Sequence, residues 1–254
     1  MLVVLLGTGA SSGIPAPKCN CPTCSEARRL PVARRRNTAV LVAIDGQKAI
    51  LVDAGFDVMP YVSELELKAV LITHWHQDHF AGLYRLRWIP GCEPKLPVYG
   101  PSPPEPEIAD KPLGLELKDV RSFKAFEIAG VRITPLPLRH SIQTYGYLLE
   151  HDGDRVAFLF DTKGLPDETA AYLKRLDLKL AIIDSNFPPG HDVGDHNNVD
   201  EAIRIGKELD AHLTILTHID HNNLPFTRLA KYVASKAKRM TVAYDGMAIH
   251  TACI

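Results

Sequence analysis

The pattern of apolar and polar residues along the chain predicts two series of short strands, each followed by helices. Short runs rich in Val, Ile and Leu, bounded by Gly, Asp or Asn, indicate strands, first over residues 2–6, 38–44, 49–52 and 69–73. A second series covers residues 131–135, 145–150, 156–160, 180–183, 213–217 and 241–244. Apolar residues at helical spacing predict helices over residues 80–88, 167–176, 198–209 and 227–238, and Asn198 or Asp200 is a suitable N-cap for the third. Residues 101–112, dense in Pro and Glu, indicate a surface loop.

Two strand-rich halves, each followed by helices, predict an α/β fold in which two sheets stack in the middle and the helices lie outside. A length of 254 residues is compatible with one large domain over residues 1–254. Hydrophobic residues make up 46% of the chain and charged residues 23%, which is an ordinary globular composition with enough apolar side chains for a sizeable core.

The overall charge argues against general binding to nucleic acids. The 29 Lys and Arg residues are balanced by 30 Asp and Glu residues, whereas nucleic-acid binding usually draws on a basic excess. Five arginines within residues 28–36 are the local exception; a solvated helix end or loop is favoured there over a role in steering phosphate.

The chain is expected to be cytoplasmic and free of membrane contacts. Its N-terminal apolar run is shorter than the core of a signal peptide, and no basic residue precedes it. No stretch approaches the ~20 apolar residues of a membrane span. In the cytoplasm, clustered cysteines more often bind metal than form disulfides.

A cluster of histidines and an aspartate directly follows the run at residues 69–73. In the sequence THWHQDH, His74 and His76 point to the same side of an extended segment, and Asp78 and His79 lead into the next helix. Ligand-type residues this close together can serve two adjacent metal ions, and imidazole and carboxylate suit Zn, Mn or Fe. A polar loop that binds nothing is disfavoured, because burying so many His and Asp side chains without a metal is costly.

Further candidate ligands stand at the ends of later apolar runs, where α/β proteins place functional groups. They are His140, Asp161 and His218. Each alone would be an ordinary loop residue, but together with the first cluster they become candidate metal ligands.

A second metal signal is the spacing of Cys19, Cys21 and Cys24. A tetrahedral zinc ion held by three thiolates needs a fourth ligand. A redox pair or unrelated free thiols are the alternative.

Several stretches give the chain a resemblance to a known family. They are GTGASSGIP at residues 7–15, CNCPTC at 19–24, VDAG at 52–55, LITHWHQDHFAGL at 71–83, PLPLRHS at 135–141, TYGYLLE at 144–150, Asp161-Thr162, His196 and LTHIDH at 216–221. The sequence resembles the metallo-β-lactamase superfamily of binuclear hydrolases. Within it, the chain is similar to the cyclic ribose-phosphate phosphodiesterases of the phosphonate (carbon–phosphorus lyase) pathway.

The resemblance implies an αββα sandwich with two central mixed sheets and a ligand set for two ions. One ion would be held by His74, His76 and His140, the other by Asp78, His79 and His218, with Asp161 as the bridge. It further implies that Asp53 orients a ligand or nearby backbone, that His196 protonates the leaving oxygen, and that His221 completes the structural zinc site of the cysteines. Asp78 is also counted among the catalytic residues. Manganese is the family expectation at the binuclear site, while ligand chemistry alone admits zinc equally.

The activity that the resemblance implies is hydrolysis of 5-phospho-α-D-ribosyl 1,2-cyclic phosphate to ribose 1,5-bisphosphate by a hydroxide bridging the metals. Two cations ~4 Å apart can share a water, lower its pKa toward ~7 and neutralise charge on the phosphate. Candidates for holding the remote phosphate are Arg34, Arg35, Arg36, Arg139 and Lys163, and the resemblance hints at a homodimer.

Two other functions stay open. A tRNA 3′-end processing endonuclease has a similar metal motif, but the near-neutral charge of the chain counts against RNA binding. A non-catalytic metal-binding accessory protein is disfavoured by the complete ligand set and by His196.

Overall fold

Two seven-stranded β-sheets form the centre of the molecule. In the computed structural model, which describes residues 1–89, 94–192 and 194–254, the first sheet has the order β14-β1-β2-β3-β4-β5-β6. Its strands are β1 (Leu2–Gly7), β2 (Ala39–Ala43), β3 (Lys48–Ala54), β4 (Glu66–Leu71), β5 (Leu96–Gly100), β6 (Leu115–Asp119) and β14 (Met247–His250). The β14-β1-β2-β3 pairs are antiparallel, and the β3-β4-β5-β6 pairs are parallel.

The second sheet repeats this division into an antiparallel and a parallel half. Its order is β13-β12-β11-β10-β9-β8-β7, and the pairs from β7 to β10 are antiparallel, those from β10 to β13 parallel. The strands are β7 (Phe126–Ile128), β8 (Val131–Pro137), β9 (Tyr145–His151), β10 (Asp154–Leu159), β11 (Leu180–Asp184), β12 (Leu213–Thr217) and β13 (Met240–Val242). Both sheets are therefore mixed, as the resemblance implied.

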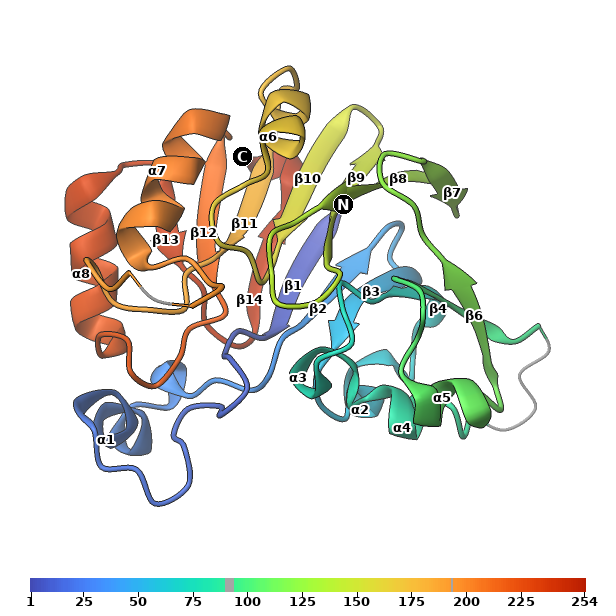
Figure 1. Cartoon of the computed structure of the whole chain (residues 1–254), viewed down its shortest axis with the longest axis horizontal. Helices are drawn as coiled ribbons and strands as arrows, with labels where there is room; N and C mark the ends of the chain where they lie inside the picture. The colour runs from blue at the N-terminus through green and yellow to red at the C-terminus, as the bar shows by residue number, and fades with distance from the viewer. Residues whose placement is uncertain (90–93, 193) are drawn as a thin grey trace.

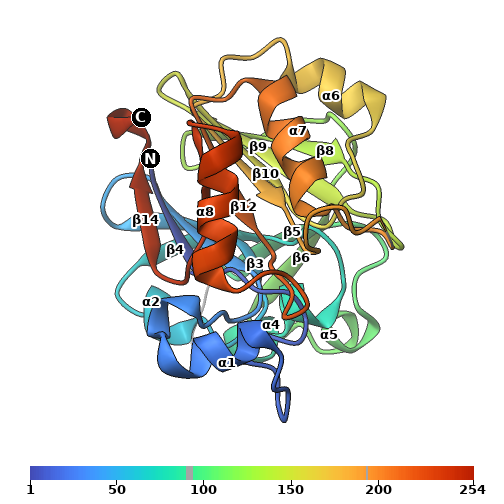
Figure 2. The same cartoon turned by 90° about the vertical axis from the view of Figure 1, so that its left-hand side faces the viewer.

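Helices cover the outer face of each sheet (Figures 1 and 2). A buried cluster joins the first sheet to α2 (Met59–Val62), α4 (Leu83–Leu86) and α5 (Pro106–Asp110), with α3 (Gln77–Phe80) beside them. On the other side, α1 (Pro22–Arg29), α6 (Asp167–Leu173), α7 (Val199–Leu209) and α8 (Phe226–Lys236) pack with the second sheet. Two 3-10 turns lie at Pro31–Ala33 and Thr251–Cys253. The predicted αββα sandwich is thus confirmed.

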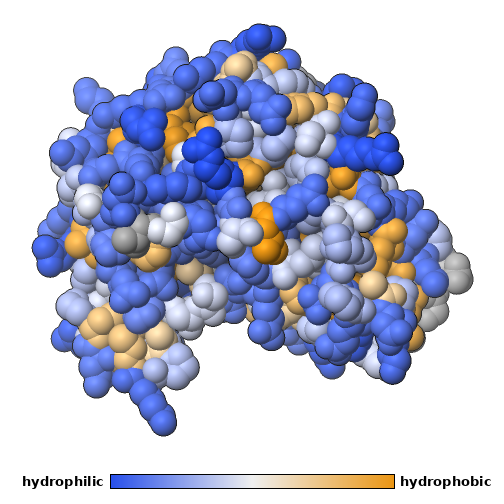
Figure 3. Space-filling view, viewed as in Figure 1, coloured by the Kyte–Doolittle hydropathy of each residue, from blue (hydrophilic) through white to orange (hydrophobic). Residues whose placement is uncertain are grey.

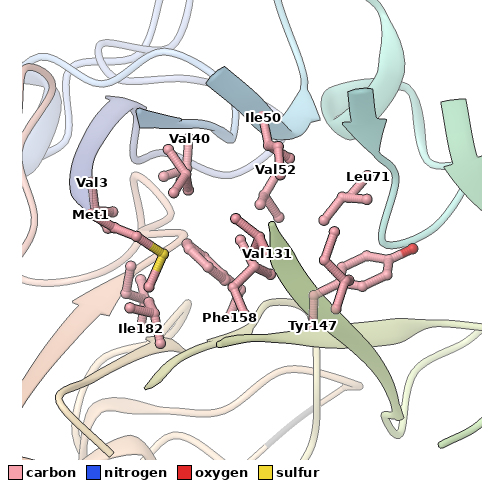
Figure 4. Close-up of a cluster of buried hydrophobic side chains, with 14 of the residues drawn as sticks. Met1, Val3, Val40, Ile50, Val52, Leu71, Val131, Tyr147, Phe158 and Ile182 are labelled. Atoms are coloured by element: carbon pink, nitrogen blue, oxygen red, sulfur yellow. The ribbon is translucent and has the colours of Figure 1, made fainter. Parts of the chain in front are cut away.

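The main core lies between the two sheets. Figure 4 shows Val3, Val40 and Leu71 of the first sheet facing Val131 and Phe158 of the second. All of these side chains are buried, and burial of this kind contributes about 1.5–3 kcal/mol for each large aliphatic or aromatic side chain. The interior between the sheets is therefore apolar, and the chemistry is placed at its edge.

Several predicted elements differ from the structure. The expected helix at residues 80–88 is instead two short helices, α3 and α4, with Gly82 between them. A Cβ on Gly82 would meet the Phe56 carbonyl oxygen at 2.2 Å, so the backbone packs closely against the segment after β3 here. The expected loop at residues 101–112 contains α5, which begins at Pro106. For α7, Asn198 is the N-cap and forms a capping box with Glu201.

No helix within the described residues combines the length and the apolar character that a membrane crossing needs.

Candidate metal centre

The carboxyl ends of neighbouring parallel strands bring the candidate ligands together. Asp161 follows β10, and His218 directly follows β12, two strands away across β11 in the same sheet. In the other sheet, the segment after β4 carries His74 and His76 past the end of β3. Parallel strands end at a common edge, which is where open α/β sheets gather functional groups.

Three imidazoles converge at one side of this edge. The Nδ1 atom of His76 lies 2.9 Å from Nε2 of His74 and 3.1 Å from Nε2 of His140. The Oδ2 atom of Asp161 lies 3.5 Å from Nε2 of His74 and 3.7 Å from Nε2 of His140. The ligand atoms of all four residues lie within 4.8 Å of one another, which is the spacing of atoms around a shared ion.

A second group shares the same carboxylate. Asp78, His79 and His218 offer ligand atoms within 4.8 Å of one another, and Oδ1 of Asp161 lies 3.3 Å from Nε2 of His79 and 3.4 Å from Nδ1 of His218. Asp161 therefore stands between both groups, with one oxygen toward each. The structure brings together all seven of the predicted ligands.

Two buried polar atoms at this centre make no hydrogen bond of acceptable geometry among the described residues. They are Nε2 of His79 and Oδ1 of Asp161, which face each other at 3.3 Å. Unpaired polar atoms in a buried site are costly, and both atom types are ordinary ligands of divalent cations. The residues present therefore fit a pair of such ions, with His74, His76 and His140 on one side, Asp78, His79 and His218 on the other, and Asp161 between.

The pKa values of His79 and Asp161 are shifted by the charged groups around them. Burial alone would lower the pKa of this imidazole, but contacts with Asp161 and Asp53 raise it well above its usual range. Conversely, burial would raise the pKa of Asp161, yet His218 and the neighbouring histidines hold it well below its usual range. An ionised carboxylate is the form that binds a cation.

Three residues of the site adopt a left-handed backbone conformation. Asp53, Asp161 and His218 have φ values of 58°, 52° and 55°. Such values are uncommon outside glycine, although Asn, Asp and His adopt them more readily than other residues. Each of the three stands at the end of a strand, so the turn of the backbone there redirects the side chain toward the metal centre.

The carboxylate of Asp53 holds the segment after β4, which carries the first candidate ligands. Its Oδ1 accepts a hydrogen bond from the Thr73 backbone N–H at 2.8 Å, and its Oδ2 accepts from Thr73 Oγ1 at 2.9 Å and lies 2.7 Å from Nδ1 of His79. The carboxylate is fully buried. A hydrogen bond at Nδ1 leaves Nε2 of His79 as the nitrogen available to an ion.

His196 lies beside the metal centre and is anchored by Asp184, the last residue of β11. The Nδ1 atom of His196 is 3.0 Å from Oδ2 of Asp184, which also accepts a hydrogen bond from the Thr162 backbone N–H at 3.0 Å. Burial would lower the pKa of His196, but Asp184 and the nearby acids raise it to about 9. Because Asp184 occupies Nδ1, Nε2 of the imidazole is free of the anchor.

Several of these supporting residues were missed in the sequence. Asp184 ends an apolar run as Asp161 does, so the same signal would have found it. Thr38 contacts Nδ1 of His218 at 2.9 Å, and Oδ2 of Asp195 lies 3.2 Å from Nδ1 of His140. No residue pattern distinguishes such a threonine or loop aspartate from its many neighbours, because their role depends on contacts between distant segments.

A cavity of about 530 Å³ opens over the metal centre. Its lining combines candidate ligands with loop residues of both halves, namely Ala10, Ser11, His76, Gln77, Asp78, His140, Asp161, Asn186, Phe187, Asp195, His196, His218, Asp220 and Asn222. The face shown in Figure 3 is largely hydrophilic, and its outline is indented between the regions of α1 and of α2 to α4.

None of the residues considered for a remote phosphate lines this cavity in the described part of the chain. Lys163 is paired with Asp192 and Glu201, and Arg36 with Asp245. Arg35 is buried and donates to Thr8 Oγ1 and to the Ala243 carbonyl oxygen. Arg35 is therefore a packing residue rather than the solvated charge expected from the arginine run, whereas the side chain of Arg36 is 41% exposed.

The cysteine cluster and His221 also meet. Cys19, Cys21, Cys24 and His221 place their ligand atoms within 4.8 Å of one another, and Sγ of Cys19 lies 3.4 Å from Nδ1 of His221. A backbone hydrogen bond from Cys21 lowers the pKa of the Cys19 thiol to about 7, which favours the thiolate at this position, whereas burial raises the pKa of the Cys24 thiol to about 12. Three sulfurs and one imidazole are a suitable set for a closed tetrahedral site.

Comparisons with known proteins agree with this geometry. The family described as "Beta-lactamase superfamily domain" matches residues 48–219. This chain therefore belongs to the metallo-β-lactamase superfamily.

Individual relatives show the breadth of the family. An octanoyltransferase of Porphyromonas gingivalis is 30% identical in an alignment of 240 positions that covers 87% of this chain and 46% of that protein, so the chain spans less than half of that relative's length. A ribonuclease Z of Mycolicibacterium gilvum is 27% identical over 74% of this chain and 80% of its own. A crystal structure described as a new diphosphatase from the PhnP family is 26% identical, covers 98% of this chain and 96% of its own, and superposes with a TM-score of 0.84.

Proposed function

We propose that the protein is a binuclear metal-dependent phosphodiesterase that hydrolyses a small cyclic phosphodiester of a sugar. The supporting observation is the position of Asp161, whose two carboxylate oxygens face two separate ligand groups. The substrate that the sequence resemblance implies, 5-phospho-α-D-ribosyl 1,2-cyclic phosphate, is one member of this class. The cavity has the size of sites for small molecules, which are ~300–1,000 Å³.

Two divalent ions, manganese or zinc, would supply charge for the phosphate and an ionised water at neutral pH. The protein's own residues would hold the metal ligands in place and supply a proton to the leaving group. Asp53 and Thr38 hold His79 and His218 in place through their Nδ1 atoms, so the ligands need no rearrangement during the reaction. Because Asp184 holds Nδ1 of His196, the opposite nitrogen of this imidazole can give a proton to the leaving oxygen.

A phosphoanhydride is the second candidate substrate, because the similar structure from the PhnP family is described as a diphosphatase. Hydrolysis of a diphosphate, like that of a diester, requires an ionised water and neutralisation of charge at the reacting phosphorus. Its leaving group is itself a phosphate, however, and protonation by His196 would matter less.

Transfer RNA processing is disfavoured despite the similarity to ribonuclease Z. RNA binding relies on Lys and Arg that neutralise backbone phosphates, and the described lining of the cavity contains neither. A non-catalytic accessory role is disfavoured because His196 has a defined proton-donating geometry that metal binding alone does not require.

A substrate panel tests the proposal. Purified protein loaded with Mn²⁺ or Zn²⁺ is offered bis(p-nitrophenyl) phosphate, the ribosyl cyclic phosphate, a dinucleoside diphosphate and a precursor tRNA. We expect hydrolysis of both diesters and loss of activity after chelation. Cleavage of the diphosphate alone would favour the second candidate, and cleavage of the tRNA alone would favour the nuclease. No turnover of any substrate at any metal loading would overturn the proposal.

A further inference from the structure

The cavity wall beyond the candidate ligands is polar and acidic. Its side chains include Ser11, Asn186, Phe187, Asp195, Asp220 and Asn222. The described lining contains no Lys or Arg, and residues 90–93 and 193, which the structure leaves out, contain none in the sequence. A negatively charged group far from the metal centre would therefore find no basic side chain in this wall.

Of the two acids in this wall, Asp195 is already engaged with the metal centre. Its Oδ2 lies 3.2 Å from Nδ1 of His140, and its Oδ1 lies 3.9 Å from Nε2 of His196. The Asp195 carboxylate thus serves to orient a candidate ligand.

Asp220 is held in place without being neutralised. Its Oδ1 accepts hydrogen bonds from the backbone N–H and Nδ2 of Asn222 at 2.9 and 2.7 Å, and its Oδ2 accepts from Ser12 Oγ at 3.2 Å. These donors are uncharged, and none of the ion pairs found among the described residues involves Asp220. A carboxylate has about four acceptor sites, so Oδ2 retains capacity for one more donor.

Phe187 adds an apolar surface to the same cavity. Its ring centroid lies 6.3 Å from that of His196 and 5.1 Å from that of His191. Asp220 is close in the fold, because its backbone N–H donates to the carbonyl oxygen of Asn186, the residue before Phe187. A fixed acceptor beside an aromatic ring is a suitable surface for a hydroxylated ring.

We propose that Asp220 and the cavity wall around it, here called the Asp220 wall, select substrates whose non-reacting part is an uncharged, hydroxyl-bearing group, such as a sugar or nucleoside. The same wall discriminates against a second phosphate at that position. A hydroxyl can donate to Oδ2 of Asp220 in a charge-assisted hydrogen bond. A phosphate would place acceptor atoms and negative charge against the same oxygen. Such repulsion of the wrong substrate is an effective source of specificity. This inference rests on the proposed function and narrows it: within that class it favours cyclic phosphodiesters that lack a remote phosphate over 5-phospho-α-D-ribosyl 1,2-cyclic phosphate, the 5-phosphorylated compound that the sequence resemblance implies.

A matched pair of substrates tests the inference. The first is a nucleoside 2′,3′-cyclic phosphate, and the second is the same compound with a 5′-phosphate. For the unsubstituted protein, we expect kcat/KM to be at least ~10-fold higher for the first compound, the discrimination expected from a mispaired polar group. Equal or greater kcat/KM for the 5′-phosphorylated compound would overturn the inference.

Variants of Asp220 show whether this residue is responsible. Asp220→Asn keeps an oxygen for the Asn222 donors and removes the charge, so the preference should fall to less than ~3-fold; Asp220→Lys should reverse it. Asp152→Asn, on a side chain that is 89% exposed, is the matched control and should leave the preference unchanged. An Asp220→Asn protein with the full preference would overturn the assignment to Asp220.

Turnover of bis(p-nitrophenyl) phosphate distinguishes a failure of the proposed function from a failure of the inference about the Asp220 wall. This diester has no sugar hydroxyl to donate to Asp220, so its turnover by the unsubstituted protein and by the Asp152→Asn control reports on the metal centre alone. If the unsubstituted protein fails on this diester and on both cyclic compounds, the proposed function has failed. If it hydrolyses them without preference, only the inference about the Asp220 wall has failed. Zinc content of the Asp220 variants verifies that the neighbouring His221 still binds.

Discussion

The Nδ1 atom of His196 lies 3.0 Å from Oδ2 of Asp184, the last residue of strand β11. This contact ties a loop imidazole to a rigid strand end. Asp184 is itself fixed by the backbone N–H groups of Thr162 and Asn186. The carboxylate therefore sets the orientation of the His196 ring, and the position of its proton, before a substrate enters.

If His196 protonates the leaving oxygen, its removal should depend on the leaving group. For His196→Ala we expect kcat on an alkyl phosphodiester to fall by ~10²–10⁴-fold, the usual contribution of general acid catalysis. Turnover of bis(p-nitrophenyl) phosphate, whose leaving group needs no proton, should change far less. Asp184→Asn should show the same pattern with a smaller amplitude. An equal loss on both substrates would assign these residues to folding or metal binding.

Asp161 is expected to be indispensable for metal retention. Asp161→Ala removes the carboxylate that faces both ligand groups, so turnover should fall by roughly 10²–10⁴-fold, equivalent to several kcal/mol of transition-state stabilisation. The fold should survive at a cost of about 1–2 kcal/mol for a left-handed alanine. Elemental analysis and circular dichroism test both expectations, with Asp177→Ala as a surface control. Full metal content and unchanged rates would refute the assignment.

Asp53 is expected to act through His79. Asp53→Asn replaces one acceptor oxygen by a donor, which leaves either Thr73 or His79 without its partner. Metal affinity should decrease by ~10–100-fold, as for other residues that orient a ligand, and the free energy of unfolding of the metal-free protein should fall by about 1–3 kcal/mol. Calorimetric metal titration and urea unfolding measure the two effects. If affinity is retained while stability falls, Asp53 has a purely structural role.

The cysteine cluster should affect stability more than chemistry. Cys21→Ser removes one sulfur from the set of four and also the group that caps α1 by accepting from the Cys24 N–H. We expect one zinc equivalent to be lost and the Tm to fall, because binding energy of a structural zinc contributes directly to folding. Cys253→Ser, at an exposed free cysteine, is the matched control. Unchanged zinc content and Tm in Cys21→Ser would exclude a structural zinc.

The sequence predicted the central strands well, because these are buried on both faces and consist of continuous apolar runs. It did not predict β5, β6, β7 and β14. β5 contains Pro97, and β6 alternates apolar with charged residues, as in Leu115 and Glu116. Such short, half-exposed strands near a sheet edge acquire their structure from the neighbouring strand and carry a weak signal of their own.

The sequence predicted the candidate metal ligands and the candidate proton donor, but not the residues that hold these side chains in place. His74, His76 and Asp78 stand in a dense local motif, which a single sequence displays. Thr38 and Asp184 contact His218 and His196 from distant segments, and only the folded chain brings them close. The sequence analysis favoured solvent for the arginine run, and Arg28, Arg29 and Arg34 are exposed as expected. Arg35 is buried instead, since long-range packing cannot be read from local charge.

The left-handed backbone at Asp53, Asp161 and His218 restricts which residues can occupy these positions during evolution. An acceptable replacement must satisfy the backbone and supply the right donor atoms at the same time. Glycine and asparagine meet the first demand but offer no charge, while glutamate offers the charge on a side chain that disfavours this conformation. Fewer substitutions should therefore be tolerated at these three strand ends than at His74 or His76. Glycine or asparagine there should mark a homologue whose set of metal ligands is incomplete.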